Sequence, residues 1–95
     1  MVMHVIAKRT LRQFWAANPD AEMPLTRWHS QMVKGQFSSF ADLKAVFAGA
    51  DWVNGYVVFD IGGNKYRLIV DVVFASQTVF VKQIFTHKEY DRWKP

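Results

Sequence analysis

The densest group of residues that could carry chemistry is the segment 86–92, Thr-His-Lys-Glu-Tyr-Asp-Arg, near the end of the chain. It combines a histidine, a phenol, carboxylates and cations, and histidine titrates near neutral pH. A histidine, a phenol and a carboxylate gathered beside a sheet could therefore transfer protons. The same segment is also typical of a helix start, with Thr86 as N-cap and Glu89 three residues later. Both roles can hold together.

Two more cations, Lys65 and Arg67, stand two residues apart in a predicted strand. Residues at this spacing project from the same strand face, about 7 Å apart, where they could bind one phosphate. Arginine suits phosphate because its planar group donates two parallel hydrogen bonds, while lysine acts as a point charge. The alternative is a solvated strand face without a ligand. Lys44 and Lys82 are likewise open to a purely solvent-facing role.

The composition describes one small basic domain. The chain has 95 residues, and we expect a single domain over 1–95. A hydrophobic fraction of 51% and an aromatic fraction of 16% exclude a disordered chain. The net charge of +4 favours polyanionic partners. Because the chain has no cysteine, a disulfide framework and a thiolate metal site are excluded, and a reducing cytoplasm is expected.

Several other site classes find no support in the sequence. His4 and His29 are far from His87 along the chain, and no close spacing of His, Asp or Glu indicates a metal site, so we expect no metal and no cofactor. Residues 62–64, Gly-Gly-Asn, lack the pattern of a phosphate-binding loop and predict a hairpin turn. No stretch approaches the roughly 18 to 20 apolar residues of a membrane helix, so we expect no membrane partner.

The first half of the chain predicts mainly helices. Residues 3–7 alternate between two faces and predict a strand. Residues 8–17 and 20–34 show helical spacing and are separated by Asn-Pro-Asp, so they should form a helical hairpin. Trp15 and Trp28 fall at core positions of these helices. A short third helix follows, with Ser39 and Asp42 in a capping arrangement and Leu43, Val46 and Phe47 on its apolar side.

The second half predicts strands. After a break over 49–55, residues 56–61, 65–74 and 78–85 read as three strands whose short connections imply an antiparallel meander. Residues 86–93 predict a short terminal helix, in which Trp93 is open to stacking on a base. The element order predicts an α+β fold, with two N-terminal helices packed on one face of an antiparallel sheet of about four strands.

The strand faces leave one question open. The middle strand divides into an apolar face and a face with the cations, respectively Tyr66, Leu68, Val70, Val72 and Lys65, Arg67, Ile69, Asp71. In the last strand, regular alternation places Val79, Val81 and Phe85 on one side and Phe80, Lys82 and Ile84 on the other. Both faces of this strand are substantially apolar. Either face of the sheet could therefore meet the helices.

Three stretches together resemble the HigB-type toxins of bacterial toxin–antitoxin pairs, a branch of the RelE-like superfamily. They are Ala-Asp-Leu-Lys at 41–44, Val-Val-Phe-Asp-Ile-Gly-Gly-Asn-Lys-Tyr-Arg-Leu-Ile at 57–69, and Thr-His-Lys-Glu-Tyr-Asp at 86–91. The resemblance covers nearly the whole chain from Met3. Two positions depart from the family pattern, because Asp60 stands where asparagine is common and Lys88 where a small residue is common.

The resemblance implies a RelE-like, microbial RNase-like fold and a ribonuclease that enters the ribosomal A site. There it would cut messenger RNA without a metal, by attack of the ribose 2′-hydroxyl on the adjacent phosphate, and a HigA-type helix-turn-helix antitoxin would silence it. Carried onto this chain, the resemblance implies that Lys65 and Arg67 stabilise phosphate charge and that His87 or Tyr90 moves protons, with Glu89 as an alternative base. The cations expected along the RNA are Lys44, Lys82, Lys88 and Arg92.

Two other functions remain open at the level of sequence. The same basic face could belong to a non-catalytic RNA-binding or ribosome-binding module, whose binding would be sensitive to salt. A degenerate toxin that only binds its antitoxin is the third possibility. RNA cleavage distinguishes the first hypothesis from both alternatives.

Overall fold

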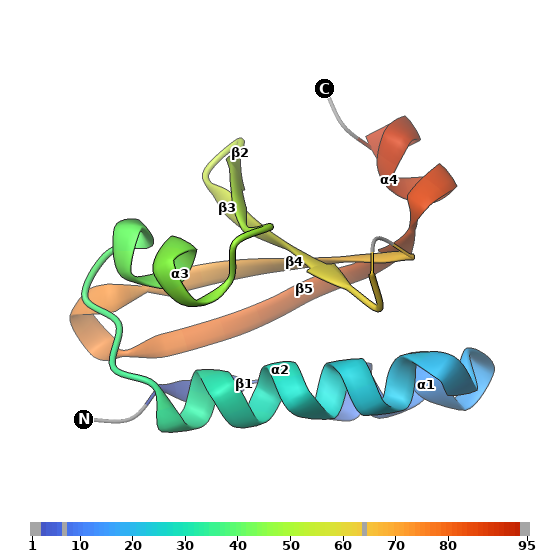
Figure 1. Ribbon diagram of the computed structural model, residues 1–95, viewed down its shortest axis with the longest axis horizontal. Helices are drawn as coiled ribbons and strands as arrows, with labels where there is room; N and C mark the ends of the chain where they lie inside the picture. The colour runs from blue at the N-terminus through green and yellow to red at the C-terminus, as the bar shows by residue number, and fades with distance from the viewer. Residues whose placement is uncertain (1–2, 7, 64, 94–95) are drawn as a thin grey trace.

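The computed structural model describes residues 3–6, 8–63 and 65–93. Within these residues, α1 and α2 lie along one side of a five-stranded sheet and α4 lies on the other (Figure 1). Helix α3 contributes Leu43 to the same buried cluster as α1 and α2. The elements in chain order are β1 (His4–Ile6), α1 (Lys8–Ala17), the 3-10 turn η1 (Pro19–Ala21), α2 (Glu22–Lys34), α3 (Phe40–Val46), β2 (Asp51–Val53), β3 (Tyr56–Ile61), β4 (Tyr66–Val73), the 3-10 turn η2 (Phe74–Ser76), β5 (Thr78–Thr86) and α4 (His87–Trp93).

The sheet has the strand order β1-β5-β4-β3-β2. Strands β3, β4 and β5 form the predicted antiparallel meander. β1 pairs with β5 in parallel, and β2 adds a fifth strand beyond β3. The predicted α+β class with both N-terminal helices on one face is confirmed, and the sheet differs from the expectation in having five strands instead of about four and in the parallel pairing of β1. The mixed sheet arises because the α1–α2 hairpin and α3 separate β1 from the meander.

Strand β2 lies inside the segment 49–55, where the sequence predicts only a break. Residues Asp51–Val53 pair with β3 through a two-residue turn at Asn54 and Gly55. Both turn residues have positive φ, 53° and 83°, as the tight hairpin turn that matches strand twist requires. Asparagine and glycine adopt this backbone most readily, so the Asn-Gly pair was a signal for the missed strand.

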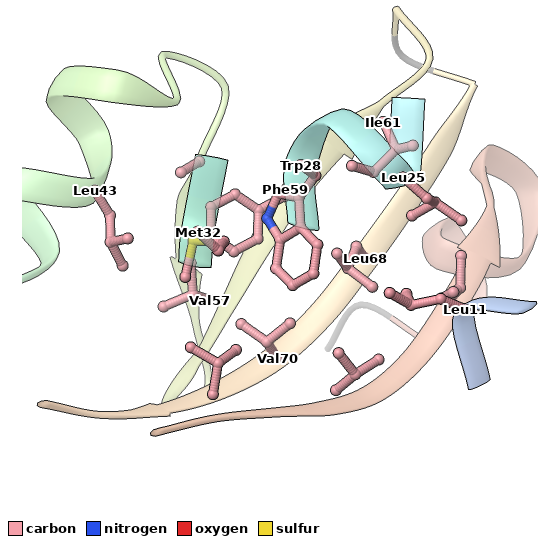
Figure 2. Packing of buried hydrophobic residues seen from close by; sticks show 14 of the residues in the cluster. Leu11, Leu25, Trp28, Met32, Leu43, Val57, Phe59, Ile61, Leu68 and Val70 are labelled. Atoms are coloured by element: carbon pink, nitrogen blue, oxygen red, sulfur yellow. The ribbon is translucent and has the colours of Figure 1, made fainter. Parts of the chain in front are cut away.

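The main core lies between α2 and the sheet. Leu25, Trp28 and Met32 of α2 are buried against the side chains of β3 and β4 (Figure 2). The Trp28 and Phe59 rings meet edge to face with centroids 5.5 Å apart. Trp15 also packs against this cluster, so the core assignment of both tryptophans is confirmed. The sheet face that meets the helices carries Tyr66, Leu68, Val70 and Val72.

Strand β5 contains a β-bulge that changes its alternation. Ile69 pairs with Gln83, but Val70 pairs with Val81, so β5 has one extra residue, Lys82. Val79, Val81 and Ile84 therefore enter the main core, while Phe85 lies on the opposite face. The predicted grouping of Phe85 with Val79 and Val81 is wrong, because an inserted residue shifts every later side chain to the other face.

A second, smaller cluster lies on the far face of the sheet. Val58 and Ile69 are buried there beneath Tyr90 of α4. Trp93 packs beside them, 5.8 Å from the Tyr90 ring centroid and 5.9 Å from that of Phe85. Trp93 is therefore an anchor for α4. No helix within the described ranges is long and apolar enough to cross a membrane.

Candidate active site on the α4 face

Arg67 is the central cation of the α4 face. It lies in β4 directly opposite Asp60 of β3, and its Nε is 3.1 Å from Oδ1 of that carboxylate. Its Nη1 also donates a hydrogen bond to the carbonyl oxygen of Tyr66 at 3.3 Å. The Arg67 side chain is only 12% exposed, compared with 37% for Asp60. The guanidinium is thus held at the edge of solvent.

Tyr90 covers the guanidinium from α4. The Arg67 Cζ lies 5.5 Å from the centroid of the Tyr90 ring, which is a cation–π distance. Burial raises the pKa of the Tyr90 phenol, and the negative charge of Asp51 adds to this effect, while Arg67 opposes it. The phenol therefore keeps its proton at neutral pH. At this site it can act as a proton donor.

The start of α4 has the predicted capping box. The Thr86 backbone N–H donates to Oε1 of Glu89 at 2.8 Å, and the Glu89 N–H donates to Oγ1 of Thr86 at 3.2 Å. The helix-start interpretation is confirmed. The Glu89 carboxylate has a structural partner, so its use as a base would require a hydrogen bond of the cap to break.

His87 begins α4 beside the turn that joins β3 to β4. Its backbone N–H donates to the carbonyl oxygen of Lys65 at 3.2 Å. The histidine side chain is exposed, and its position follows Phe85, the β5 partner of Arg67, by two residues. The fold therefore brings His87, Arg67 and Tyr90 to the same end of the β3–β4 hairpin.

Lys65 does not join Arg67 in the predicted way. It precedes the first residue of β4, and its Nζ lies 2.7 Å from Oδ2 of Asp20 in η1. The other oxygen of Asp20 accepts a hydrogen bond from the Tyr66 hydroxyl at 2.6 Å. Tyr66 belongs to the helix-facing side of the sheet, whereas Arg67 faces α4. The prediction that Lys65 and Arg67 project from one strand face is wrong, because Lys65 lies in the turn.

The four cations expected to contact RNA occupy different parts of the surface. Lys88 and Arg92 are exposed on α4, one helical turn apart. Lys82 is exposed at the β5 bulge, with its Nζ 5.7 Å from the centroid of the Phe80 ring. Lys44 of α3 donates to the carbonyl oxygen of Ala50 at 2.8 Å, on the helix side of the sheet. Lys88 and Arg92 are thus the members of this set that share a helix with Tyr90.

Two carboxylate contacts at this end of the fold were not predicted from the sequence. The Asp60–Arg67 pair could have been found, since Ile61 pairs with Tyr66 across the turn and the next pair outward is then Asp60 with Arg67. The Asp20 contact has no local signal, because Asp20 is distant from Lys65 in sequence. The described part of the chain contains no group of three or more His, Cys, Asp or Glu that could hold a metal ion.

Comparison with known proteins places this geometry in a family. A model of the HigB toxin family, described as the RelE-like toxic component of a toxin–antitoxin system, matches residues 21–93. The chain belongs to the HigB toxin family. The matched span contains Asp60, Arg67, His87 and Tyr90, so the whole α4 face lies inside it. The resemblance to HigB-type toxins found in the sequence is confirmed.

Curated relatives of this HigB family member extend over almost the entire chain. The mRNA interferase toxin HigB of Escherichia coli (strain K12) is 34% identical over 92 residues, which cover 94% of this chain and 88% of the relative. The mRNA interferase HigB of Shigella flexneri has the same identity and coverage. The mRNA interferase HigB of Escherichia coli O6:H1 (strain CFT073) is 29% identical over 93 residues, covering 95% of this chain and 90% of that protein.

Proposed function

We propose that this chain is an mRNA interferase, a toxin that cuts messenger RNA during translation and is neutralised by an antitoxin. The observation that carries the proposal is the pairing of the Arg67 guanidinium with the Tyr90 phenol beside the exposed start of α4. This pairing combines phosphate charge stabilisation with a protonated donor. The relatives named as mRNA interferases and the match to a toxin family support the same function.

The reaction proposed is intramolecular transfer at the ribose. A base removes the proton of the 2′-hydroxyl, the 2′-oxygen forms a bond to the adjacent phosphorus, and the bond from phosphorus to the 5′-oxygen breaks. An acid donates a proton to that leaving oxygen. The products are a 2′,3′-cyclic phosphate and a 5′-hydroxyl, so atoms and charge balance without a co-reactant. DNA, which lacks the 2′-hydroxyl, should resist cleavage.

We assign these roles to individual residues from the charge and the exposure of each side chain. Arg67 stabilises the negative charge that develops on the phosphate oxygens. Tyr90 is the proposed donor of the proton to the leaving oxygen, because its ring lies beside the Arg67 guanidinium and a phenol is protonated at neutral pH. His87, exposed at the start of α4, is the proposed base, with Glu89 as the alternative. Lys65, already paired with Asp20, contributes mainly through its carbonyl oxygen, which holds the His87 N–H.

The proposed setting is the ribosomal A site in the cytoplasm. A net charge of +4 is modest for a protein that must bind RNA unaided. A ribosome that presents the message would remove the need for an extended basic surface. Lys88 and Arg92 of α4 then make the main phosphate contacts, with smaller contributions from Lys82 and Lys44. The proposed partner that silences the toxin is a HigA-type helix-turn-helix antitoxin.

Cleavage of a translated message in a purified cell-free system tests the proposal. Wild-type protein should produce fragments with cyclic or 3′-phosphate ends, while Arg67→Ala and His87→Gln should each reduce the rate by about 100-fold or more. Arg12→Ala and His4→Gln are matched controls, because both residues are exposed on other elements. Binding of RNA or ribosomes without any fragments would sink the proposal and favour a non-catalytic binding module.

A further inference from the structure

Asp60 occupies an unusual position at the edge of β3. Strand β2 pairs with β3 only as far as Val58, so Asp60 lies beyond the end of that neighbour. The segment that leads into β2 lies along this part of the edge of β3, which β2 does not cover. A Cβ atom added at Gly49 would lie 2.5 Å from Oδ2 of Asp60, closer than real Cβ contacts allow. Gly49 has no positive φ in the structure, so this close approach is the reason for glycine here.

The two oxygens of Asp60 thus have separate neighbours. Oδ2 lies against Gly49, while Oδ1 is 3.1 Å from Nε of Arg67. On its other side the Arg67 guanidinium meets the ring of Tyr90. A continuous set of contacts therefore runs from the loop before β2, through the carboxylate and the guanidinium, to α4.

We propose that Gly49 and Asp60 are positioning residues that fix the orientation of the Arg67 guanidinium toward the phosphate. This inference rests on the proposed ribonuclease function. Arginine is a long side chain with many rotamers, and a carboxylate bound to Nε restricts them before RNA arrives. A reacting group displaced by about 1 Å can lose about 100-fold in rate. The small residue at Gly49 lets the carboxylate sit where it can reach Nε.

A model in which Asp60 only competes with phosphate for the positive charge of Arg67 predicts the opposite effect of replacing Asp60. If Asp60 only neutralised Arg67, it would weaken phosphate binding, and every neutral replacement would raise activity. If Asp60 positions Arg67, an acceptor oxygen must remain at this place, whatever its charge. Asp60→Asn keeps such an oxygen and Asp60→Ala removes it, so the two variants separate orientation from charge.

The first experiment compares these variants in single-turnover cleavage of a translated message. We expect Asp60→Ala to lower the maximal rate by about 100-fold and Asp60→Asn to stay within a few-fold of wild type. The loss should fall on the maximal rate and leave the concentration for half-saturation nearly unchanged. An increase in both variants, or equal rates in Asp60→Ala and wild type, would overturn the inference.

A second variant tests the contact without changing any charge. Gly49→Ala pushes a methyl group against the carboxylate and should lower the maximal rate in the same direction as Asp60→Ala. The adjacent exposed residue gives the control, Ala48→Ser, which should behave as wild type. Because both changes act through Arg67, Gly49→Ala combined with Asp60→Ala should be no worse than Asp60→Ala alone. Additive losses would contradict a shared mechanism.

A readout independent of cleavage keeps the inference separate from the proposed function. The Nε–Hε resonance of Arg67, assigned by its loss in Arg67→Lys, reports the orientation of the guanidinium in a nitrogen-labelled sample. It should shift or broaden in Asp60→Ala and Gly49→Ala and persist in Asp60→Asn. If wild-type protein cuts no RNA, the proposed function fails while this resonance still decides the positioning. An unchanged Nε–Hε resonance in Asp60→Ala and Gly49→Ala would refute the positioning of Arg67 by these two residues.

Discussion

The Nζ of Lys65 lies 2.7 Å from Oδ2 of Asp20, across 45 residues of sequence. The pKa of the Asp20 carboxyl is lowered, first by this hydrogen bond and then by the one from Tyr66. The contact with Asp20 raises the pKa of Lys65, while Tyr66's own hydrogen bond to Asp20, together with burial, raises the pKa of the Tyr66 phenol. Asp20 therefore ties the β3–β4 turn to the helical hairpin, on the side of the sheet opposite α4.

This contact should make stability depend on pH at both extremes. In the folded protein Asp20 binds its proton more weakly than in the unfolded chain. Its contribution to the free energy of unfolding is therefore fully present above pH 3.8 and is lost as the pH falls through the lower pKa of the folded state. The contribution of Lys65 to the free energy of unfolding is present below pH 10.5 and is lost as the pH rises through the raised pKa of the folded state. Urea midpoints of wild type and Asp20→Asn should differ at neutral pH and converge in acid. A constant difference at all pH values would rule out this linkage.

Lys65 and Arg67 should differ in their importance for cleavage. Lys65 is 64% exposed in its side chain and paired with Asp20, while Arg67 is nearly buried beside Tyr90. We expect Lys65→Ala to reduce the cleavage rate by less than about 10-fold, compared with about 100-fold or more for Arg67→Ala. Single-turnover rates of both variants measure this. Equal losses would show that the two cations act on the same phosphate, as the sequence suggested.

Removal of a single hydroxyl tests the proton donor. Tyr90→Phe keeps the ring in the second cluster but removes the phenolic proton, so we expect folding to persist and the cleavage rate to fall by about 100-fold. Tyr56→Phe is a matched control, because Tyr56 packs in the same cluster. Thermal unfolding and single-turnover cleavage should be measured together. A fully active Tyr90→Phe variant would remove the phenol from the mechanism.

The capping box allows a test of Glu89 as a base. Glu89→Gln retains an oxygen that can accept from the Thr86 N–H, whereas Thr86→Ala removes the N-cap and should cost about 1 kcal/mol of unfolding free energy. We expect Glu89→Gln to keep at least about half of the cleavage rate, since His87 is the proposed base. A loss of about 100-fold with normal stability would instead identify Glu89 as the base.

The salt dependence of ribosome or RNA binding should locate the phosphate contacts. Replacing Lys88 and Arg92 by alanine should reduce the slope of log affinity against log salt by about 0.7 per lost contact. The pair Arg9→Ala and Arg12→Ala makes the same change in net charge on α1, across the sheet, and should leave the slope unchanged. The same reduction in both double variants would point to net charge in place of a defined surface.

Local patterns were sufficient for most of the fold. The range predicted for α1 agrees with the structure, and Ser39 caps α3 by accepting from the Asp42 N–H at 3.4 Å. Such features involve neighbours along the chain, so residue types at fixed spacing determine them. Strand β2 is as short as β1, and its signal in the sequence is the Asn-Gly pair of the following hairpin turn, which the expected break over 49–55 left out of account. The parallel pairing of β1 depends on contacts with the distant strand β5, for which the sequence contains no local signal.

The candidate site was predictable in its residue types and less so in its geometry. His87, Arg67 and Tyr90 are candidates by their residue types, and the structure brings them to the same end of the β3–β4 hairpin, while their catalytic roles stay predictions. The separation of Lys65 from Arg67 depends on where the turn ends and on Asp20, which belongs to another layer of the fold. The buried environment of the Tyr90 phenol likewise arises from packing across two strands and α4.

The bulge in β5 also limits how the length of this chain can vary. Deletion of Lys82 alone would remove the bulge and keep Ile84 on the helix side, whereas deletion of both Lys82 and Gln83 would turn Ile84 toward α4 and Phe85 toward the helices. The connection to α4 would turn with them and move Tyr90 away from Arg67. The stretch between Val81 and Thr86 can therefore lose the bulge residue, but it cannot lose a second residue without turning α4 away from its place. Natural variants should therefore differ in this stretch by the single bulge residue and not by two residues, and the nearby turn at 74–77, which holds Phe37 and His4 through hydrogen bonds of Gln77, should keep its length.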